Sequence, residues 1–136
     1  MDTIMATAEY LGGLRTKVIH LKSGNSATTD APVDNNGKGE AFSPTDLVCA
    51  SLSSCMMTIM GLVAEREHIN LSGLQAEIIK VMSVNPRKIA EIKIRFLHPN
   101  LVATESQKQK LINAAQTCPV ALSLSENLKQ TISFDF

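Results

Sequence analysis

The spacing of apolar and polar residues predicts a small β-sheet in the first part of the chain. Residues 5–11 and 14–21 are short, partly alternating segments separated by Gly12-Gly13, a dipeptide that favours a tight hairpin turn. Residues 26–31 follow a Ser-Gly-Asn turn and can supply a third strand. Residues 32–39 are rich in Asp, Asn and Gly, which is typical of a loop.

A long helix is predicted to begin at Ser43-Pro44-Thr45-Asp46. Ser43 can cap free backbone N–H groups, Pro44 fits the first helical position, and Asp46 can complete a capping box. Small and hydroxyl residues occupy the side of this helix opposite its apolar stripe, and the charges at 65–67 mark its solvated end. Apolar residues recur at helical spacing at Val48, Leu52, Cys55, Met56, Ile59, Leu62 and Val63.

The stretch 47–64 carries no charge and is close to the roughly 20 residues that a membrane span needs. Five Ser, Thr and Gly residues interrupt it, and no Lys or Arg stands directly before it. We therefore expect a central helix buried in a protein core and no membrane partner.

The second half of the chain is predicted to contain three strands and two helices. Residues 74–84 and 89–97 favour an antiparallel pair of strands, in which Ile92, Ile94 and Phe96 share one face. An amphipathic helix follows at 104–117 with Thr104 as its cap, and Cys118-Pro119 interrupts it. Residues 120–125 can form a short helix, and residues 128–136 alternate as a strand. The order β-β-β-α-β-β-α-α-β indicates the α+β class.

Length and composition favour one neutral, globular domain over residues 1–136, divided into a sheet at 1–31, the central helix at 43–68 and a β-β-α-α-β part at 74–136. Thirteen basic residues balance thirteen acidic ones, which argues against a polyanionic partner. Only 4% of residues are aromatic, so base stacking is poorly supplied and no nucleic-acid partner is expected. The first residues lack a basic segment followed by an apolar one, and we expect a cytoplasmic protein.

Three cysteines carry the candidate chemistry. Cys49, Cys55 and Cys118 form neither a disulfide framework nor a CxxC zinc site, and the three histidines match no metal spacing, so we expect no metal. Cys55 lies on the apolar stripe, and Cys49 points about 120° away from it around the helix. Taken alone, each is more readily explained as a small buried side chain than as a reactive thiol. Cys118 precedes Pro119, and the N-terminus of the short helix would favour a thiolate there, although the pair equally explains a helix break.

Two segments together change this picture. The chain resembles the family of osmotically inducible protein C and organic hydroperoxide resistance protein (OsmC/Ohr) in two places. These are Phe42-Ser43-Pro44-Thr45-Asp46-Leu47 together with the following residues 50–55, which include Cys55, and Cys118-Pro119-Val120. The resemblance extends over nearly the whole chain, in the pattern of a divergent OsmC-like branch. It implies a long buried helix packed against antiparallel sheets, in an intertwined homodimer with active sites at the subunit interface.

The resemblance also implies a thiol-dependent peroxidase that reduces organic hydroperoxides. Cys55 matches the peroxidatic cysteine and Cys118 the resolving one, with which it forms a disulfide that an external dithiol, lipoyl-type or other, reopens. No metal, haem, flavin or other cofactor is implied. The apolar side chains expected to line the substrate site are Phe42, Met56, Met57 and Ile59, although a methionine at such a position is more often part of the core.

The family places an arginine near the peroxidatic sulfur, and Arg15 on the hairpin is the match for thiolate activation. In the hydroperoxide-specific members a carboxylate ten positions before the cysteine holds this arginine, but this chain has Thr45 there. Asp46 could replace it only if its side chain is not used in the capping box.

The departure at Thr45 favours an alternative, a non-catalytic or weakly active stress protein of this fold that binds a small apolar ligand or senses oxidants. An RNA-binding domain of K-homology type is a third candidate, but the neutral charge and the missing GxxG loop argue against it.

Overall fold

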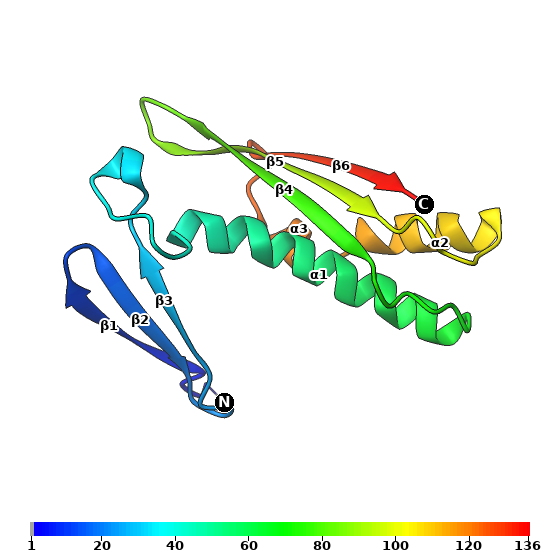
Figure 1. The fold of residues 1–136 in the computed structure, drawn as a ribbon, viewed down its shortest axis with the longest axis horizontal. Helices are drawn as coiled ribbons and strands as arrows, with labels where there is room; N and C mark the ends of the chain where they lie inside the picture. Colours follow the sequence, from blue (N-terminus) through cyan, green and yellow to red (C-terminus); the bar gives the residue numbers. More distant parts are fainter. Residues whose placement is uncertain (1) are drawn as a thin grey trace. The chain divides into compact units, whose positions relative to one another are not determined.

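The computed structural model describes residues 2–136 and confirms the α+β class (Figure 1). Each predicted element is present with ends within two residues of those expected, and a short 3₁₀ turn lies in the predicted loop. The chain divides into two compact units, Met1–Leu47 and Val48–Phe136. The elements are β1 (Ala6–Gly12), β2 (Arg15–His20), β3 (Ser26–Asp30), η1 (Val33–Asn35), α1 (Pro44–Arg66), β4 (Gln75–Ser83), β5 (Lys88–Leu97), α2 (Glu105–Ala115), α3 (Pro119–Ser123) and β6 (Lys129–Asp135).

The first unit is an antiparallel sheet in the order β1-β2-β3. Gly12 and Gly13 have φ angles of +86° and +62°, which most L-residues avoid, so the predicted glycine hairpin is confirmed. The β2–β3 register places Arg15 opposite Asp30, at the end of β3 where the chain becomes buried.

The second unit is a three-stranded sheet, β4-β5-β6, with α1, α2 and α3 on one side of it (Figure 1). Alternation on β5 directs Ile92, Ile94 and Phe96 into the core, as predicted. β4 and β5 are antiparallel, but β6 runs parallel to β5. The expectation of purely antiparallel sheets was therefore wrong for this pair. The reason is that α2 and α3 form a crossover, which returns the chain to the end of the sheet where β5 began.

Helix α1 begins with the predicted capping box. The Ser43 N–H donates to Oδ2 of Asp46 at 3.0 Å, and the Asp46 N–H donates to Oγ of Ser43 at 3.1 Å. These two bonds satisfy backbone donors that the first helical turn leaves free.

The buried face of α1 differs from the predicted stripe. Val48 and Leu62 are exposed, whereas the buried row is Cys49, Leu52, Ser53, Met56, Met60 and Ala64. This row combines the large side chains Leu52, Met56 and Met60 with the small ones Cys49, Ser53 and Ala64. By length and a mean hydropathy of 2.0, α1 also passes the test for a membrane span, but its buried row is part of the hydrophobic core of the second unit.

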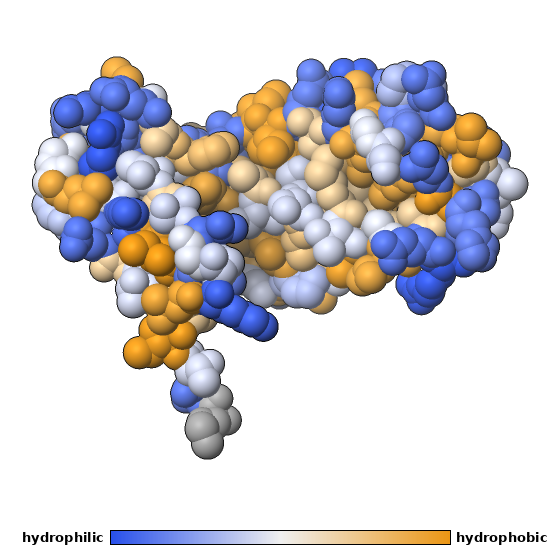
Figure 2. Space-filling view, turned by 60° about the horizontal axis from the view of Figure 1, so that its bottom comes forward, coloured by the Kyte–Doolittle hydropathy of each residue, from blue (hydrophilic) through white to orange (hydrophobic). Residues whose placement is uncertain are grey.

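Apolar surface remains exposed in both units (Figure 2). Among the described residues of the first unit, 2–47, no apolar side chain is buried, and Tyr10, Leu11 and Leu14 on the hairpin are all exposed. Small sheets without a covered face are marginal in water. This unit therefore depends on cover from outside its own sheet.

Candidate active site

Cys55 and Cys118 come together in the second unit. Cys55 is half-buried on α1 and packs against the edge of the core, and Cys118 is fully buried directly before α3. Their side chains are close enough for Cys55 to raise the pKa of Cys118, and both are free thiols. The fold thus brings two sulfur atoms from distant parts of the sequence into contact, as a disulfide cycle requires.

Cys118 occupies the N-cap position of α3, with Pro119 in the first turn. Its Sγ accepts a hydrogen bond from the Ala121 N–H at 3.2 Å, so the predicted position at a helix N-terminus is confirmed.

The expected thiolate at Cys118 is not favoured, however. Burial raises the pKa of Cys118 above its ordinary value, and the neighbouring Cys55 raises it further. The Ala121 and Val120 N–H groups lower it, but by less than burial raises it. Cys118 is therefore a neutral thiol at neutral pH, because desolvation of a charged sulfur outweighs the field of a one-turn helix.

The third cysteine has a different environment. Cys49 is 2% exposed and belongs to the hydrophobic core. In residues 2–136 no group of three or more His, Cys, Asp or Glu side chains is arranged to hold a metal ion.

Arg15 is held by a buried carboxylate in the first unit. Its Nε and Nη2 donate to Oδ1 and Oδ2 of Asp30 at 2.7 and 2.9 Å, a bidentate pair, and Nη2 lies 3.4 Å from Glu40. Asp30 is 1% exposed and also accepts the Glu40 N–H at 3.1 Å. Arg15 holds the pKa of the Asp30 carboxyl below its usual range although burial opposes this, and Asp30 raises the pKa of Arg15.

The sequence did not point to Asp30 as a partner for Arg15. A signal was present, since two strands joined by a short turn can place an acidic residue across from Arg15. Asp46, the substitute considered for the carboxylate missing at Thr45, uses Oδ2 in the capping box. Asp46 could replace the missing carboxylate only if its side chain is not used in the capping box, and Oδ2 does not meet this condition.

The expected substrate-binding residues have different environments. Met56 is 1% exposed within the core, so it offers no surface to a substrate and is a packing residue. Met57 and Ile59 are half-buried at the edge of the same core. Phe42 belongs to the first unit and is 59% exposed. Of the four, Met57 and Ile59 remain the candidates on α1 for contact with an apolar ligand.

Comparison with known proteins gives a consistent result. The profile of the family described as OsmC-like protein matches residues 37–133, which include the capping box, both contacting cysteines, β4, β5 and most of β6. A search of curated proteins found no significant match.

Solved structures of similar fold cover nearly the whole chain. A protein described as an osmotic stress induced and detoxification response protein from Psychrobacter arcticus is 43% identical, with a TM-score of 0.94 over 98% of this chain and 97% of that one. An OsmC-like protein from Mycoplasma pneumoniae is 20% identical, with a TM-score of 0.78 over 98% and 97% of the two chains. An organic hydroperoxide resistance protein from Legionella pneumophila is 17% identical, with a TM-score of 0.74 over 100% of both chains. The latter two show the shared fold.

Proposed function

This chain belongs to the family of OsmC-like proteins, and on that premise we propose that it is a thiol-dependent peroxidase that reduces organic hydroperoxides. The observation that carries the proposal is the contact between Cys55 and Cys118. Neighbours of the same fold are named organic hydroperoxide resistance proteins, which supports organic hydroperoxides as the substrate class. Met57 and Ile59, which are half-buried at the edge of the core, supply apolar surface for an alkyl peroxide, and Ile59 lies one helical turn after Cys55.

The proposed cycle has three steps. The Cys55 thiolate attacks the terminal oxygen of the hydroperoxide, the O–O bond breaks, and the alcohol leaves with a proton while Cys55 becomes a sulfenic acid. The Cys118 sulfur then attacks the Cys55 sulfur, its proton leaves with the hydroxyl as water, and a disulfide forms. An external dithiol reduces this disulfide by exchange and is itself oxidised to a disulfide.

The surroundings of Cys118 suit the second step better than the first. Only a thiolate attacks a peroxide effectively, and a sulfur whose pKa is raised by burial is mostly protonated. Cys118 is therefore a poor first nucleophile but a protected one, since a buried neutral thiol resists direct oxidation. This difference between the two thiols supports the more exposed Cys55 as the peroxidatic cysteine.

Arg15 is the proposed activating cation. The family resemblance assigns it a carboxylate partner at a position where this chain has threonine, and Asp30 provides that partner instead. A bidentate, buried carboxylate fixes the guanidinium in one orientation, as a positioned charge requires. In this proposal, Asp30 on β3 compensates for the absence of a carboxylate at Thr45 on α1.

A homodimer is also part of the proposal. The first unit buries no apolar side chain among its described residues, and α1 exposes Val48 and Leu62 outside its buried row. A second copy of the chain would cover such surfaces without a further partner. Light scattering at micromolar concentration should give twice the chain mass, and a monomer would contradict this part of the proposal.

The test is thiol titration before and after addition of a slight excess of cumene hydroperoxide, followed by peptide mapping. We expect two thiols to disappear and to map to a Cys55–Cys118 disulfide. The Cys55→Ser variant should keep its remaining thiols, and Cys49→Ser, the matched control in the core of the same helix, should behave as wild type.

If all three thiols survive in the wild-type chain, the peroxidase proposal fails. The remaining candidate is then a stress protein of this fold that binds an apolar ligand. If the thiols react stoichiometrically but no dithiol reopens the disulfide, an oxidant sensor is favoured. The return of both cysteines to free thiols at the end of each cycle requires a reducing compartment, and we propose the cytoplasm.

A further inference from the structure

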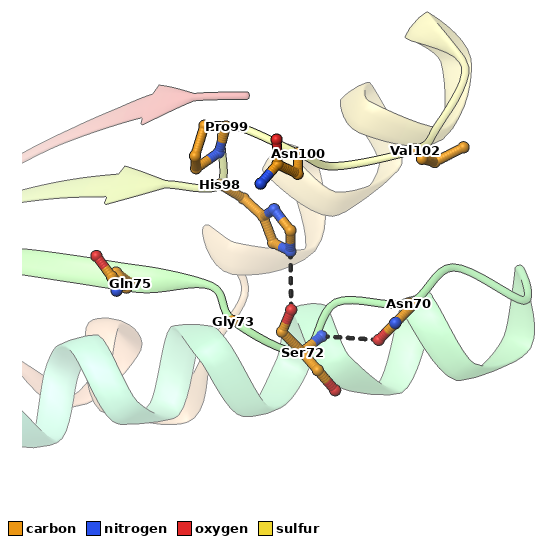
Figure 3. A pocket seen from close by; sticks show the side chains of 8 residues that line it. All are labelled: Asn70, Ser72, Gly73, Gln75, His98, Pro99, Asn100 and Val102. Atoms are coloured by element: carbon orange, nitrogen blue, oxygen red, sulfur yellow. Dashed lines mark hydrogen bonds between the residues drawn. The ribbon is translucent and has the colours of Figure 1, made fainter.

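A cavity of about 500 Å³ lies between two loops of the second unit (Figure 3). One wall is the segment between α1 and the start of β4, with Asn70, Ser72 and Gln75, and the other is the loop between β5 and α2, with Pro99, Asn100 and Val102. Neither contacting cysteine lines it, and no lining side chain carries a permanent charge. The cavity is thus separate from the candidate active site in its residues and in its chemistry.

Both walls are fixed by their own hydrogen bonds. The Ser72 N–H donates to Oδ1 of Asn70 at 3.1 Å, and the Leu74 N–H donates to the Leu71 carbonyl at 3.1 Å. On the other side the His98 N–H donates to the Asp135 carbonyl at 3.1 Å. Because these bonds hold the backbone of both walls, little backbone freedom is lost when a ligand enters.

His98 joins the two walls and leaves one nitrogen unsatisfied. Its side chain is only 9% exposed, and Nε2 lies 2.9 Å from the Ser72 carbonyl oxygen. A carbonyl oxygen only accepts, so Nε2 carries the proton, and Nδ1 of the neutral ring is a lone-pair acceptor. Nδ1 is buried and has no hydrogen-bond partner among the described residues. Such an atom is costly to bury unless a donor reaches it.

We propose that this cavity binds an uncharged carboxamide ligand whose N–H donates to Nδ1 of His98. The amide and hydroxyl groups of Asn70, Ser72 and Gln75 both donate and accept, as a carboxamide does, and Pro99 and Val102 offer an apolar edge to the rest of the ligand. An anion would find no permanent positive charge in the lining, and a cation would find no carboxylate there.

Access to Nδ1 requires a local movement. Nδ1 itself is covered, and Figure 3 shows it on the side of the ring where the exposed Asn100 side chain lies. Asn100 turns aside when the ligand enters, since the cavity provides space for this. Replacing Asn100 by alanine should therefore preserve or strengthen binding, which distinguishes it from His98.

The experiment is NMR titration of the ¹⁵N-labelled, reduced protein with benzamide. We expect the backbone amides of residues 70–75 and 98–102 to shift together with His98 Nδ1, while the ring nitrogens of His20 and His68 stay unchanged as internal controls. N,N-dimethylbenzamide, which has no N–H donor, should bind at least about tenfold more weakly, because a site built around a hydrogen bond rejects the analogue that lacks it. The Cys55→Ser chain should bind benzamide as wild type does.

Three results would overturn the proposal. The first is that no backbone amide signal in either loop shifts at benzamide concentrations on the order of 10 mM, which would show that the cavity does not bind this ligand. The second is equal affinity for the two benzamides, and the third is movement of the loops without movement of Nδ1. All three comparisons use the wild-type chain, so none depends on whether a variant folds. The variants then test the hydrogen bond itself, since His98→Leu should weaken benzamide binding and Asn100→Ala should preserve or strengthen it.

Discussion

Replacing Cys118 by alanine and by serine should separate its structural contribution from its proposed role in the disulfide. The side chain is fully buried, and Sγ caps α3 by accepting the Ala121 N–H at 3.2 Å. Serine keeps an oxygen that can accept the same bond, whereas alanine removes both the cap and the buried atom.

The magnitudes follow from these two contacts. Loss of an N-cap acceptor costs about 0.5–2 kcal/mol. Loss of one buried atom the size of a methylene costs about 1 kcal/mol. Cys118→Ala should therefore lower the free energy of unfolding by about 2 kcal/mol, and Cys118→Ser by about 1 kcal/mol, since serine loses apolar burial but keeps the cap.

Urea denaturation of the reduced proteins measures this difference, and intact mass after peroxide treatment measures the chemistry. Both variants should fail to form the disulfide, and their Cys55 should retain added oxygen. Equal stability of the two variants would refute the capping contribution. Loss of two thiols in either variant would show that Cys118 is not the resolving cysteine.

Three further predictions concern the core, the ion pair and the disulfide. Leu111→Ala should lower the free energy of unfolding by about 2–5 kcal/mol in urea denaturation, because Leu111 is completely buried in α2; a loss near zero would contradict the packing. Pairing with Arg15 holds the pKa of Asp30 below its ordinary value of 3.8, so its stabilisation is complete above that pH and is lost as the pH falls below it. The free energy of unfolding of Asp30→Asn should therefore not show this decrease at low pH. Identical acid-unfolding curves for the variant and the wild type would contradict the contribution of the Arg15–Asp30 pair. Because burial raises the pKa of Cys118, the rate of disulfide closure in stopped-flow experiments should still increase above pH 9.0, the ordinary thiol value, and a plateau below it would contradict this.

The elements of this fold were predictable because their signals are local. Gly12-Gly13 fixes a hairpin through φ angles that side chains avoid, and the Ser43 and Asp46 capping box begins α1. Alternation on β5 placed Ile92 and Phe96 in the core. Each signal acts over a few residues, so no knowledge of the partner elements was needed.

The orientation of α1 was not predictable in the same way. The helix is apolar on most sides, so its own sequence does not decide which side is buried. Cys49 and Ala64 are buried whereas Val48 and Leu62 are exposed, and this depends on the sheet that packs against the helix. The parallel direction of β6 likewise depends on the α2–α3 crossover and not on the pattern within the strand.

The sequence by itself determined the strands and helices, their caps and turns, and, through two short cysteine segments, the family. Only the tertiary structure decided that Cys118 is a buried neutral thiol in contact with Cys55, and that Asp30 holds Arg15. The same applies to the unsatisfied Nδ1 of His98. The physical reason is that pKa, burial and ion pairing depend on atoms brought together from distant positions, whereas caps, turns and alternation depend on neighbours along the chain.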